Sequence, residues 1–316
     1  MRMIFSKKTT LLMLSCVLTA LCVNSCKRFQ GEVEVPAYLH LDRIDIAPQS
    51  QNAPSSEAGF YTSLIDAAQV ICHFKGDPAE TTLGVFQLPF TIPVLYQGAI
   101  EYVIIVPVVK QNGIAGTRIA YPYYQTIKLE NVVVAADSIT NLGSFDKDNN
   151  QWTLKGHYFP LSRMKVLVED YFEPTAFSSI FDSNMTWVHD DPQGARTGQG
   201  YGCVTVPDSV LSYTFSIPAN LSPAVTDMLY LEMDYHTDLE LYLNMLGFPG
   251  SSTGSLMSKA IMGLYPNTQW QKIYINLGRT WSQFSYNTPI TIFFQVANPD
   301  KKGGKVYLDN VKIITI

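Results

Sequence analysis

The sequence predicts an all-β chain in which a small immunoglobulin-like β-sandwich is followed by a jelly-roll β-sandwich. Its 316 residues include 18 Tyr, 16 Phe, 20 Gly and 18 Pro, which strands and tight turns favour. Runs in which apolar and polar residues alternate are frequent, and we find no window with sustained helical spacing and a matching cap. A polar stretch at residues 137–150 is predicted to link the two sandwiches.

The first predicted domain covers residues 36–136. A phase slip in the alternation between Leu41 and Ile44 indicates a bulge. Residues 75–78 have turn chemistry, and Asn112-Gly113 is the best turn signal in this half. Strands are predicted at residues 38–46, 68–74, 82–88, 101–109 and 126–135. Six or seven strands in roughly 100 residues are typical of a small immunoglobulin-like sandwich.

The second predicted domain covers residues 151–316 and holds all four Trp. Val306 and Leu308 keep one phase of the alternation, whereas Val311 and Ile313 keep the opposite phase, so Asp309-Asn310 must absorb an extra residue. Strands are predicted at residues 165–168, 201–206, 211–217, 228–235, 239–245, 271–277, 290–296 and 305–314, with Trp270 in the core. This number of short strands predicts a jelly roll.

The first 26 residues indicate where the protein is located. A basic start precedes the apolar run from Leu11 to Val23, which is shorter than the about 20 residues that span a bilayer. The following Val23-Asn24-Ser25-Cys26 resembles a bacterial lipobox, whose cysteine is diacylated and becomes the new N-terminus. We therefore expect a lipoprotein signal peptide at residues 1–25 and a tether at 26–35. The alternative is an ordinary cleaved signal peptide with Cys26 as a free thiol.

The residues after Cys26 favour the outer membrane. Several acyl chains, each contributing about 0.8 kcal/mol per buried methylene, would hold the protein almost permanently. Lys27 follows the cysteine where an inner-membrane retention signal carries Asp. The acidic residues that favour surface export in Bacteroidota-type organisms come only at Glu32 and Glu34. The periplasmic and the cell-surface face both stay open.

Charge and cysteine content exclude two classes of protein. Without the three basic residues of the leader, 19 of the 22 basic residues remain against 27 acidic residues, a net charge of −8. Such a balance argues against a nucleic-acid partner, which demands clustered Lys and Arg. Cys72 and Cys203 stand far apart in different predicted domains, so we expect buried thiols and no disulfide framework.

Three passages of the second domain resemble jelly-roll carbohydrate-binding modules. They are residues 169–173, an acidic and aromatic strand end, Trp270 to Leu277, and Tyr307 to Ile313. The mature chain as a whole resembles a group of Bacteroidota outer-membrane lipoproteins. This resemblance implies a cellular location but no activity. The residues that carry this second resemblance are 35–39, 88–95, 112–114, 117–118 and 121–124.

The first resemblance implies two kinds of site. Some relatives hold a structural Ca²⁺ with carboxylates of the first strand and an Asp near the C-terminus. Carried over to this chain, the ligands would be Glu173, with Glu169 or Asp170, and Asp309. The alternative is that Asp309-Asn310 only forms the β-bulge and that the other acidic side chains are solvated. Sugar-binding modules combine aromatic faces with amides and carboxylates. The candidates for that role are Tyr230, Glu232, Asp234, Tyr242 and Asn244 on neighbouring strands, with Trp187, Trp281 and Tyr286 near loops. Sandwiches also bury Trp and expose Tyr without any ligand.

The sequence favours a non-catalytic function. It contains neither G-x-S-x-G nor HExxH, so a hydrolase is the weakest reading. We expect binding of a glycan or glycoprotein. The alternative is a structural subunit of an outer-membrane protein assembly that docks through Tyr121, Tyr123 and Tyr124.

Two loops and one modification motif complete the predictions. The glycine-rich residues 194–202 read as a flexible rim beside a groove, and 189–191 as a turn. Residues 146–150 match the opening of an EF-hand loop but lack its later ligands, which favours a linker. Ser138 and Ser209 each follow Asp and precede an aliphatic residue, as in Bacteroidota O-glycosylation acceptors.

Overall fold

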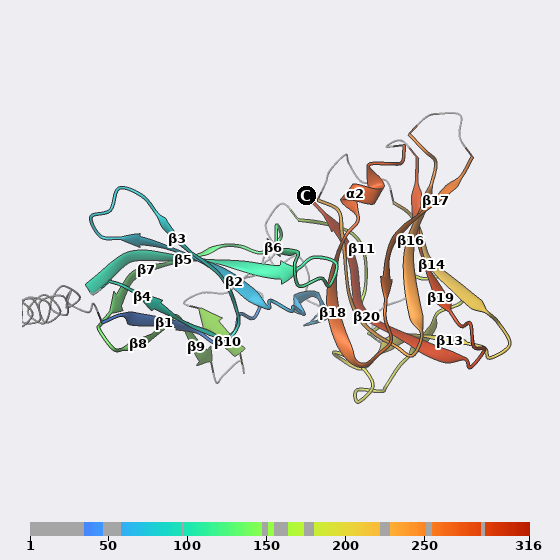
Figure 1. The fold of residues 1–316 in the computed structure, drawn as a ribbon. Helices are drawn as coiled ribbons and strands as arrows, with labels where there is room; N and C mark the ends of the chain where they lie inside the picture. The colour runs from blue at the N-terminus through green and yellow to red at the C-terminus, as the bar shows by residue number, and fades with distance from the viewer. Residues whose placement is uncertain are drawn as a thin grey trace, which may run out of the picture.

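The computed structural model describes residues 35–46, 58–96, 98–146, 151–154, 164–173, 180–221, 228–250, 255–285 and 288–316. Two β-sandwiches follow one another along the chain, as predicted (Figure 1). Among the described residues, the helices are a 3-10 turn, η2 (Ala58–Tyr61), and one turn of α-helix, α2 (Gly278–Trp281). None of these described helices has the length and apolarity needed to cross a membrane.

The first sandwich packs a three-stranded sheet, ordered β4-β1-β8, against a sheet in which β5 pairs with β2, β6 and β7. Its strands are β1 (Ala37–Leu41), β2 (Ala67–Phe74), β3 (Thr81–Gln87), β4 (Phe90–Val94), β5 (Gly98–Lys110), β6 (Arg118–Ala120), β7 (Ile127–Val134) and β8 (Ile139–Asn141). The predicted hairpin of β2 and β3 is confirmed. Asn112 and Gly113 both have positive φ, as a tight turn at this dipeptide requires.

The predicted linker at residues 137–150 needs correction. β8 pairs in parallel with β1, so this stretch begins as part of the first sandwich. It is followed by a hairpin of β9 (Gly143–Asp146) and β10 (Gln151–Leu154). The sequence conceals β8 because a strand of three residues is too short to show alternation.

The second sandwich has two sheets, which we call the near sheet and the far sheet by their distance from the first sandwich (Figure 1). The near sheet runs β12-β13-β20-β15-β18, with β11 also paired to β20, and the far sheet runs β14-β19-β16-β17. Their strands are β11 (Lys165–Asp170), β12 (Thr186–Val188), β13 (Tyr201–Val206), β14 (Ser212–Leu221), β15 (Tyr230–Thr237), β16 (Glu240–Gly247), β17 (Met257–Leu264), β18 (Asn267–Asn276), β19 (Ile290–Ala297) and β20 (Gly304–Thr315).

The predicted bulge in the last strand is confirmed. Glu232 faces Lys312 across β15 and β20, but Asp234 faces Asp309, so β20 contains one extra residue between these pairs. Asn310 absorbs it with a φ of 51°. The bulge turns successive polar side chains toward one side of the near sheet, which is the side of the first sandwich.

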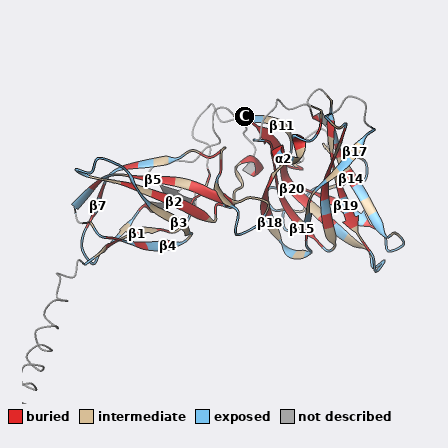
Figure 2. Ribbon diagram, turned by 45° about the horizontal axis from the view of Figure 1, so that its top comes forward, coloured by how far each residue is buried: buried red, intermediate tan, exposed pale blue. Residues whose placement is uncertain are grey.

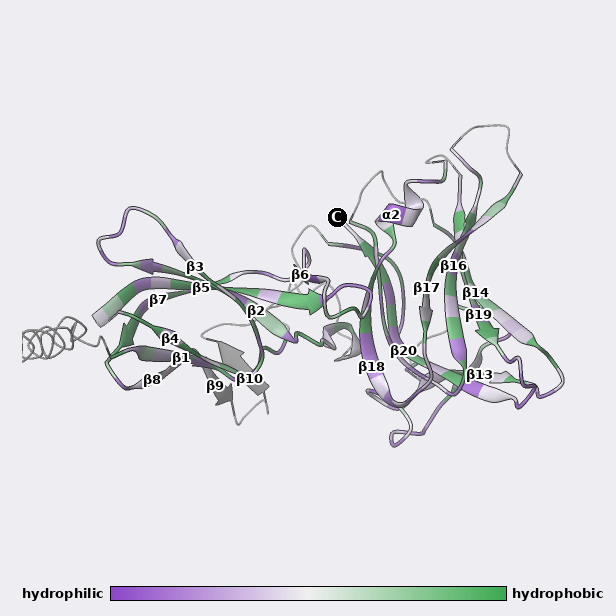
Figure 3. Ribbon diagram, viewed as in Figure 1, coloured by the Kyte–Doolittle hydropathy of each residue, from purple (hydrophilic) through white to green (hydrophobic). Residues whose placement is uncertain are grey.

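Buried residues fill the space between the two sheets of each sandwich (Figure 2). Apolar and polar segments alternate along the strands (Figure 3). β15 departs from this rule, because seven of its eight residues are buried. One face of β15 packs into the core of the second sandwich and the other faces the first sandwich. Cys72 and Cys203 are both free and buried, as predicted.

Tyrosines join the two sandwiches. Tyr121, Tyr123 and Tyr124 lie between β6 and β7 and are buried in one apolar cluster with Tyr230 and Tyr274 of the near sheet. The Tyr121 ring meets the Tyr230 and Tyr274 rings edge-on, at centroid distances of 5.3 and 4.8 Å. The prediction that Tyr121, Tyr123 and Tyr124 form an external docking surface is therefore wrong, because the protein's own second sandwich occupies that surface.

Candidate binding site between the sandwiches

The five predicted sugar-binding residues of the strands do not share a face. Tyr230, Glu232 and Asp234 lie on β15 of the near sheet and are buried against the first sandwich. Tyr242 and Asn244 lie on β16 of the far sheet. The alternation had identified outward positions on both strands correctly. The expectation that they line one concave sheet is wrong, because the chain passes from one sheet to the other between β15 and β16.

The other predicted aromatic positions are also divided. On the far sheet, Tyr242 is exposed and donates its hydroxyl to Glu240 at 2.6 Å. Trp187 is half-buried on β12, beside the ring of Phe172. Trp281 is buried in the core of the second sandwich, and Tyr286 lies outside the described residues.

Trp270 is not a core residue, contrary to the prediction. It is half-buried beside Tyr201 and His236, and its Nε1 donates to the carbonyl of Gly194 at 3.0 Å. This contact anchors the glycine-rich loop to the sheet. The loop predicted as a flexible rim is held at Gly194, while Arg196, Gly198 and Gln199 are exposed. The turn predicted at residues 189–191 lies at 192–194 instead, where the Asp191 carboxylate accepts the backbone N–H of Gly194.

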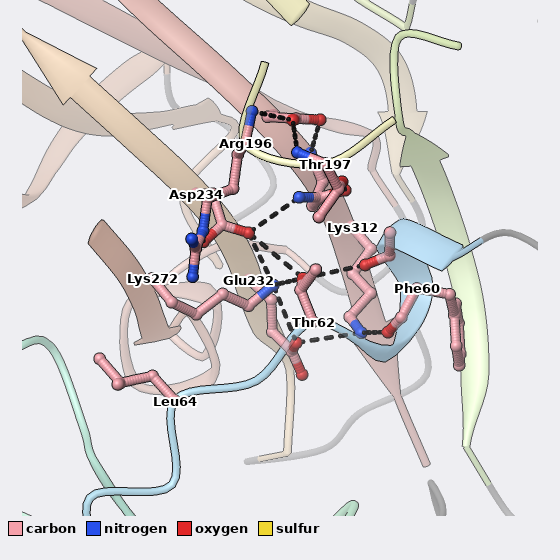
Figure 4. A network of polar contacts seen from close by, with 12 residues as sticks. Phe60, Thr62, Leu64, Arg196, Thr197, Glu232, Asp234, Lys272 and Lys312 are labelled. Atoms are coloured by element: carbon pink, nitrogen blue, oxygen red, sulfur yellow. Dashed lines mark hydrogen bonds and ion pairs between the residues drawn. The ribbon is translucent and has the colours of Figure 1, made fainter. Parts of the chain in front are cut away.

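A buried ionic network lies where the near sheet meets the first sandwich (Figure 4). Lys312 Nζ lies 3.1 Å from a carboxylate oxygen of Glu232, and Lys272 Nζ lies 3.8 Å from the same oxygen and 3.4 Å from Asp234. Tyr121 donates its hydroxyl to Glu232 at 2.6 Å. All four charged side chains are almost completely buried.

The segment that begins with η2 closes this network from the first-sandwich side. Lys312 Nζ donates to the carbonyl of Phe60 at 2.7 Å, and Lys272 Nζ donates to the hydroxyl of Thr62 at 2.9 Å (Figure 4). Burial lowers the pKa of Lys312, while the neighbouring Glu232 carboxylate raises it. Buried charges of this kind require their partners, so the network favours one relative placement of the two sandwiches.

Asp309 is the third acid of this region. Its carboxylate accepts the backbone N–H groups of Arg196, Thr197 and Asn310 at 2.7 to 3.1 Å. Burial raises the pKa of Asp309 to about 8, although these N–H groups oppose the rise. Asp309 therefore holds the glycine-rich loop.

A cleft of about 930 Å³ opens beside the network, between the first sandwich and the β17–β18 hairpin. It falls within the about 300–1,000 Å³ that small-ligand sites occupy. The first sandwich contributes residues that precede β2 or follow β5, and the second contributes residues of β15, β17 and β18. The polar residues that line it are Asp66, Lys110, Asn112, Asn267, Gln271 and Lys272.

Amide groups are arranged on both walls of the cleft. Asn112 joins the walls, since its backbone N–H donates to the carbonyl of Tyr274 at 2.8 Å and its side-chain oxygen accepts the N–H of Asn276 at 3.0 Å. Asn267 uses its oxygen to accept the N–H of Thr237, and its Nδ2 is buried beside Tyr235. Gln271 is exposed, so its amide is accessible.

Apolar and aromatic surface completes the cleft. Tyr265, at the β17–β18 turn, is 79% exposed. Leu64 and Ile114 are exposed on the opposite wall. Sequence reasoning missed the cleft: it identified Asn112-Gly113 only as a turn, and nothing in the sequence pairs that turn with β18.

The structure describes all of the predicted calcium ligands. In the described part of the chain, no group of three or more His, Cys, Asp or Glu side chains could hold a metal ion. Asp309 is occupied by backbone N–H donors, Glu173 accepts the N–H of Gln199, and Glu169 accepts the hydroxyl of Tyr171. These carboxylates already accept hydrogen bonds, and a structural calcium stays a prediction.

Two of the three predicted modification sites lie within the described residues. Ser209 is exposed and Ser138 is half-buried, and glycosylation of either remains a prediction. Cys26, the predicted lipidation site, lies outside the described residues.

No family model matches the chain, and no curated protein matches it. Solved structures that resemble part of it include TmCBM61 in complex with β-1,4-galactotriose, with 13% identity over 48% of this chain and 88% of that one, at a TM-score of 0.28. A family 11 carbohydrate-binding module of a Clostridium thermocellum cellulosomal cellulase has 14% identity over 47% and 95%, at 0.32. The CBM22-1 xylan-binding domain of Paenibacillus barcinonensis has 11% identity over 47% and 93%, at 0.33. These similarities are distant, so a functional proposal must rest on the cleft itself.

Proposed function

We propose that this protein is a non-catalytic glycan-binding protein of the outer membrane, anchored by lipid at Cys26, and that its ligand occupies the cleft between the sandwiches. The observation that carries the proposal is the composition of the cleft: an exposed amide and a partly exposed lysine on facing walls, with an exposed tyrosine at the mouth. Saccharides need this combination, because their hydroxyls bond planar polar groups in pairs and their C–H faces stack on aromatic rings.

Each wall has a defined part in this proposal. Gln271 of β18 bonds hydroxyls from the second-sandwich side, and Lys110, held by Asp66, donates from the first-sandwich side. Tyr265 offers its ring at the entrance. Because hydrogen bonds made by Tyr121, Thr62 and Phe60 tie the first sandwich to the ionic network, the cleft is formed before the ligand arrives, which lowers the entropic cost of binding.

The structural-subunit alternative loses its main support. It depended on a free patch formed by Tyr121, Tyr123 and Tyr124, and these side chains are buried between the sandwiches. A glycoprotein ligand stays within the proposal, since its sugar would enter the same cleft.

Affinity electrophoresis against a panel of polysaccharides tests the binding function. We expect retardation by at least one polysaccharide, and loss of most of it in Tyr265→Ala and in Gln271→Ala, both of which alter exposed side chains. Tyr242→Ala is the matched control, because it removes an exposed tyrosine from the far sheet. Equal retardation of all variants, or a loss confined to Tyr242→Ala, would refute the cleft as the site.

The anchor has a separate test. We expect radiolabelled palmitate to enter the protein in cells that export it and to be absent from Cys26→Ser. Label that persists in the variant, or that is absent from both proteins, would refute lipidation at Cys26 without touching the proposed ligand site.

A further inference from the structure

Two basic side chains share one carboxylate at the first-sandwich wall of the cleft. Lys110 ends β5 and Arg118 begins β6, and the two residues face each other directly across the strand pair. Lys110 Nζ lies 3.1 Å from Oδ2 of Asp66, and Arg118 Nη2 lies 2.9 Å from the same oxygen. Like charges directly opposite on neighbouring strands destabilise a sheet. One carboxylate compensates only one of the two, so this wall retains an uncompensated positive charge.

No other acid of the described cleft lining balances that charge. Asp66 is the one carboxylate among the lining residues, and the remaining charged residue there is Lys272. Lys272 is compensated by Glu232 and Asp234 of the ionic network, which face it from β15. Lys110 is about one third exposed, so its ammonium group reaches the cleft.

The uncompensated positive charge is confined to this wall, whereas the chain as a whole has a formal charge of −5. An acidic protein repels anions over most of its surface, and an anion binds only where positive charge is concentrated. The pair of Lys110 and Arg118 is such a place, and Lys110 lines the same cleft as the amide of Gln271.

We propose that the cleft selects acidic glycans, and that Lys110 binds the carboxylate of a uronic acid residue while Gln271 bonds the hydroxyls of the chain. This inference rests on the proposed glycan-binding function and specifies its ligand class. Ammonium-to-carboxylate hydrogen bonds are about twice as strong as those between neutral groups, so the acidic sugar residue would dominate recognition.

The test compares acidic polysaccharides with their own carboxyl-reduced forms. Polygalacturonate, alginate, hyaluronate and glucuronoxylan are used with the wild-type protein in affinity electrophoresis, each beside its reduced derivative. We expect at least one acidic polymer to retard the protein, and its reduced derivative to lose about tenfold or more in affinity, as the loss of one charge-assisted hydrogen bond predicts.

Variants then assign the effect to Lys110. Lys110→Gln should lose about tenfold for the acidic polymer, Lys110→Arg should retain most of the affinity because it keeps the charge, and Lys128→Gln should bind as wild type. Lys128 is the matched control, since it is a half-exposed lysine on β7 of the same sandwich. Melting temperatures equal to wild type show that each variant is folded.

The outcomes separate this inference from the binding function. Retardation by neutral or reduced polymers, at an affinity unaffected by Lys110→Gln, overturns acidic selectivity and leaves glycan binding intact. Failure of every acidic and neutral polymer to retard the protein overturns both. A salt series tests the ionic contact directly. Raising NaCl from 50 to 500 mM shortens the Debye length about threefold, so the affinity for the acidic polymer should fall. An affinity that does not fall overturns the ionic contact.

Discussion

The near and far sheets of the second sandwich follow the same rule of alternation but have different outer faces. On β15 of the near sheet, the outward residues Tyr230, Glu232 and Asp234 are buried by the first sandwich. On β16 of the far sheet, the outward Tyr242 is 41% exposed and Glu240 is half-buried, while Asn244 is buried. A polar outward residue is therefore structural in one sheet and available in the other. The two sheets differ because the first sandwich packs on the near sheet, and the sequence of a strand does not show what packs on its outer face.

The largest predicted difference comes from removing one acid of each sheet. Glu232→Ala leaves Lys312 buried without its carboxylate, which should lower the free energy of unfolding by about 3–5 kcal/mol. Glu240→Ala on the far sheet should cost less than about 1 kcal/mol. Urea denaturation of both variants measures the contrast. Equal losses would show that the network is not the stabilising contact of the near sheet.

The next difference concerns a single hydroxyl. Tyr121→Phe removes the 2.6 Å hydrogen bond to Glu232, a bond to a charged group in a buried site. We expect a loss of about 1.5–3 kcal/mol in the free energy of unfolding. Burial, followed by the Glu232 charge, raises the pKa of Tyr121 well above its usual value, so the hydroxyl donates throughout the neutral range. A loss close to zero in urea denaturation would contradict this bond.

The third prediction is a pH dependence that Asp309 confers. Its folded pKa of about 8 lies above the ordinary 3.8, so between these values the folded state keeps a proton that the unfolded state releases. Stability from this group therefore falls as pH rises through that window, by at most about 1.4 kcal/mol per pH unit. Asp309→Asn cannot titrate.

Denaturation of wild type and Asp309→Asn at pH 5, 6, 7 and 8 checks this sign. The stability of wild type relative to the variant should decrease with rising pH. Arg196 and Asp234 adjoin Asp309 and are present in both proteins, so the difference isolates the Asp309 carboxyl. Parallel pH curves would show that this carboxyl keeps an ordinary pKa.

The smallest effect is expected on the far sheet. Tyr242→Phe removes the hydroxyl that bonds Glu240 at 2.6 Å, but both groups lie at the surface. We expect the urea midpoint to stay within experimental error of wild type. A clear fall would mean that the far sheet has a cover of its own, and that the two sheets differ less than the described residues indicate.

The fold was largely predictable because alternation reports which side of a strand is apolar. The boundaries of β13 were predicted to the residue, and the bulge at Asp309-Asn310 followed from the change of phase in the last strand. β8 and β12 were missed because three residues carry too little pattern. β17 was missed because its burial does not alternate regularly.

The candidate site was much less predictable. Glu232 and Asp234 were correctly read as outward residues, yet their partners Lys272 and Lys312 come from other strands, and their cover comes from the segment that follows η2. The cleft combines Asp66 and Lys110 of the first sandwich with Gln271 of the second, and these walls meet only when the sandwiches dock. Contacts between distant segments leave no periodic signal in a single sequence.

The shared tyrosine cluster also sets an order of assembly. Tyr123 contacts the backbone of Ile314, which lies 191 residues later in the chain. A polypeptide that emerges N-terminus first must hold its first sandwich with this apolar end bare until β20 has been added and paired. Docking then follows the pairing of β20, and a chain shortened by its last few residues would leave the apolar end of its first sandwich uncovered.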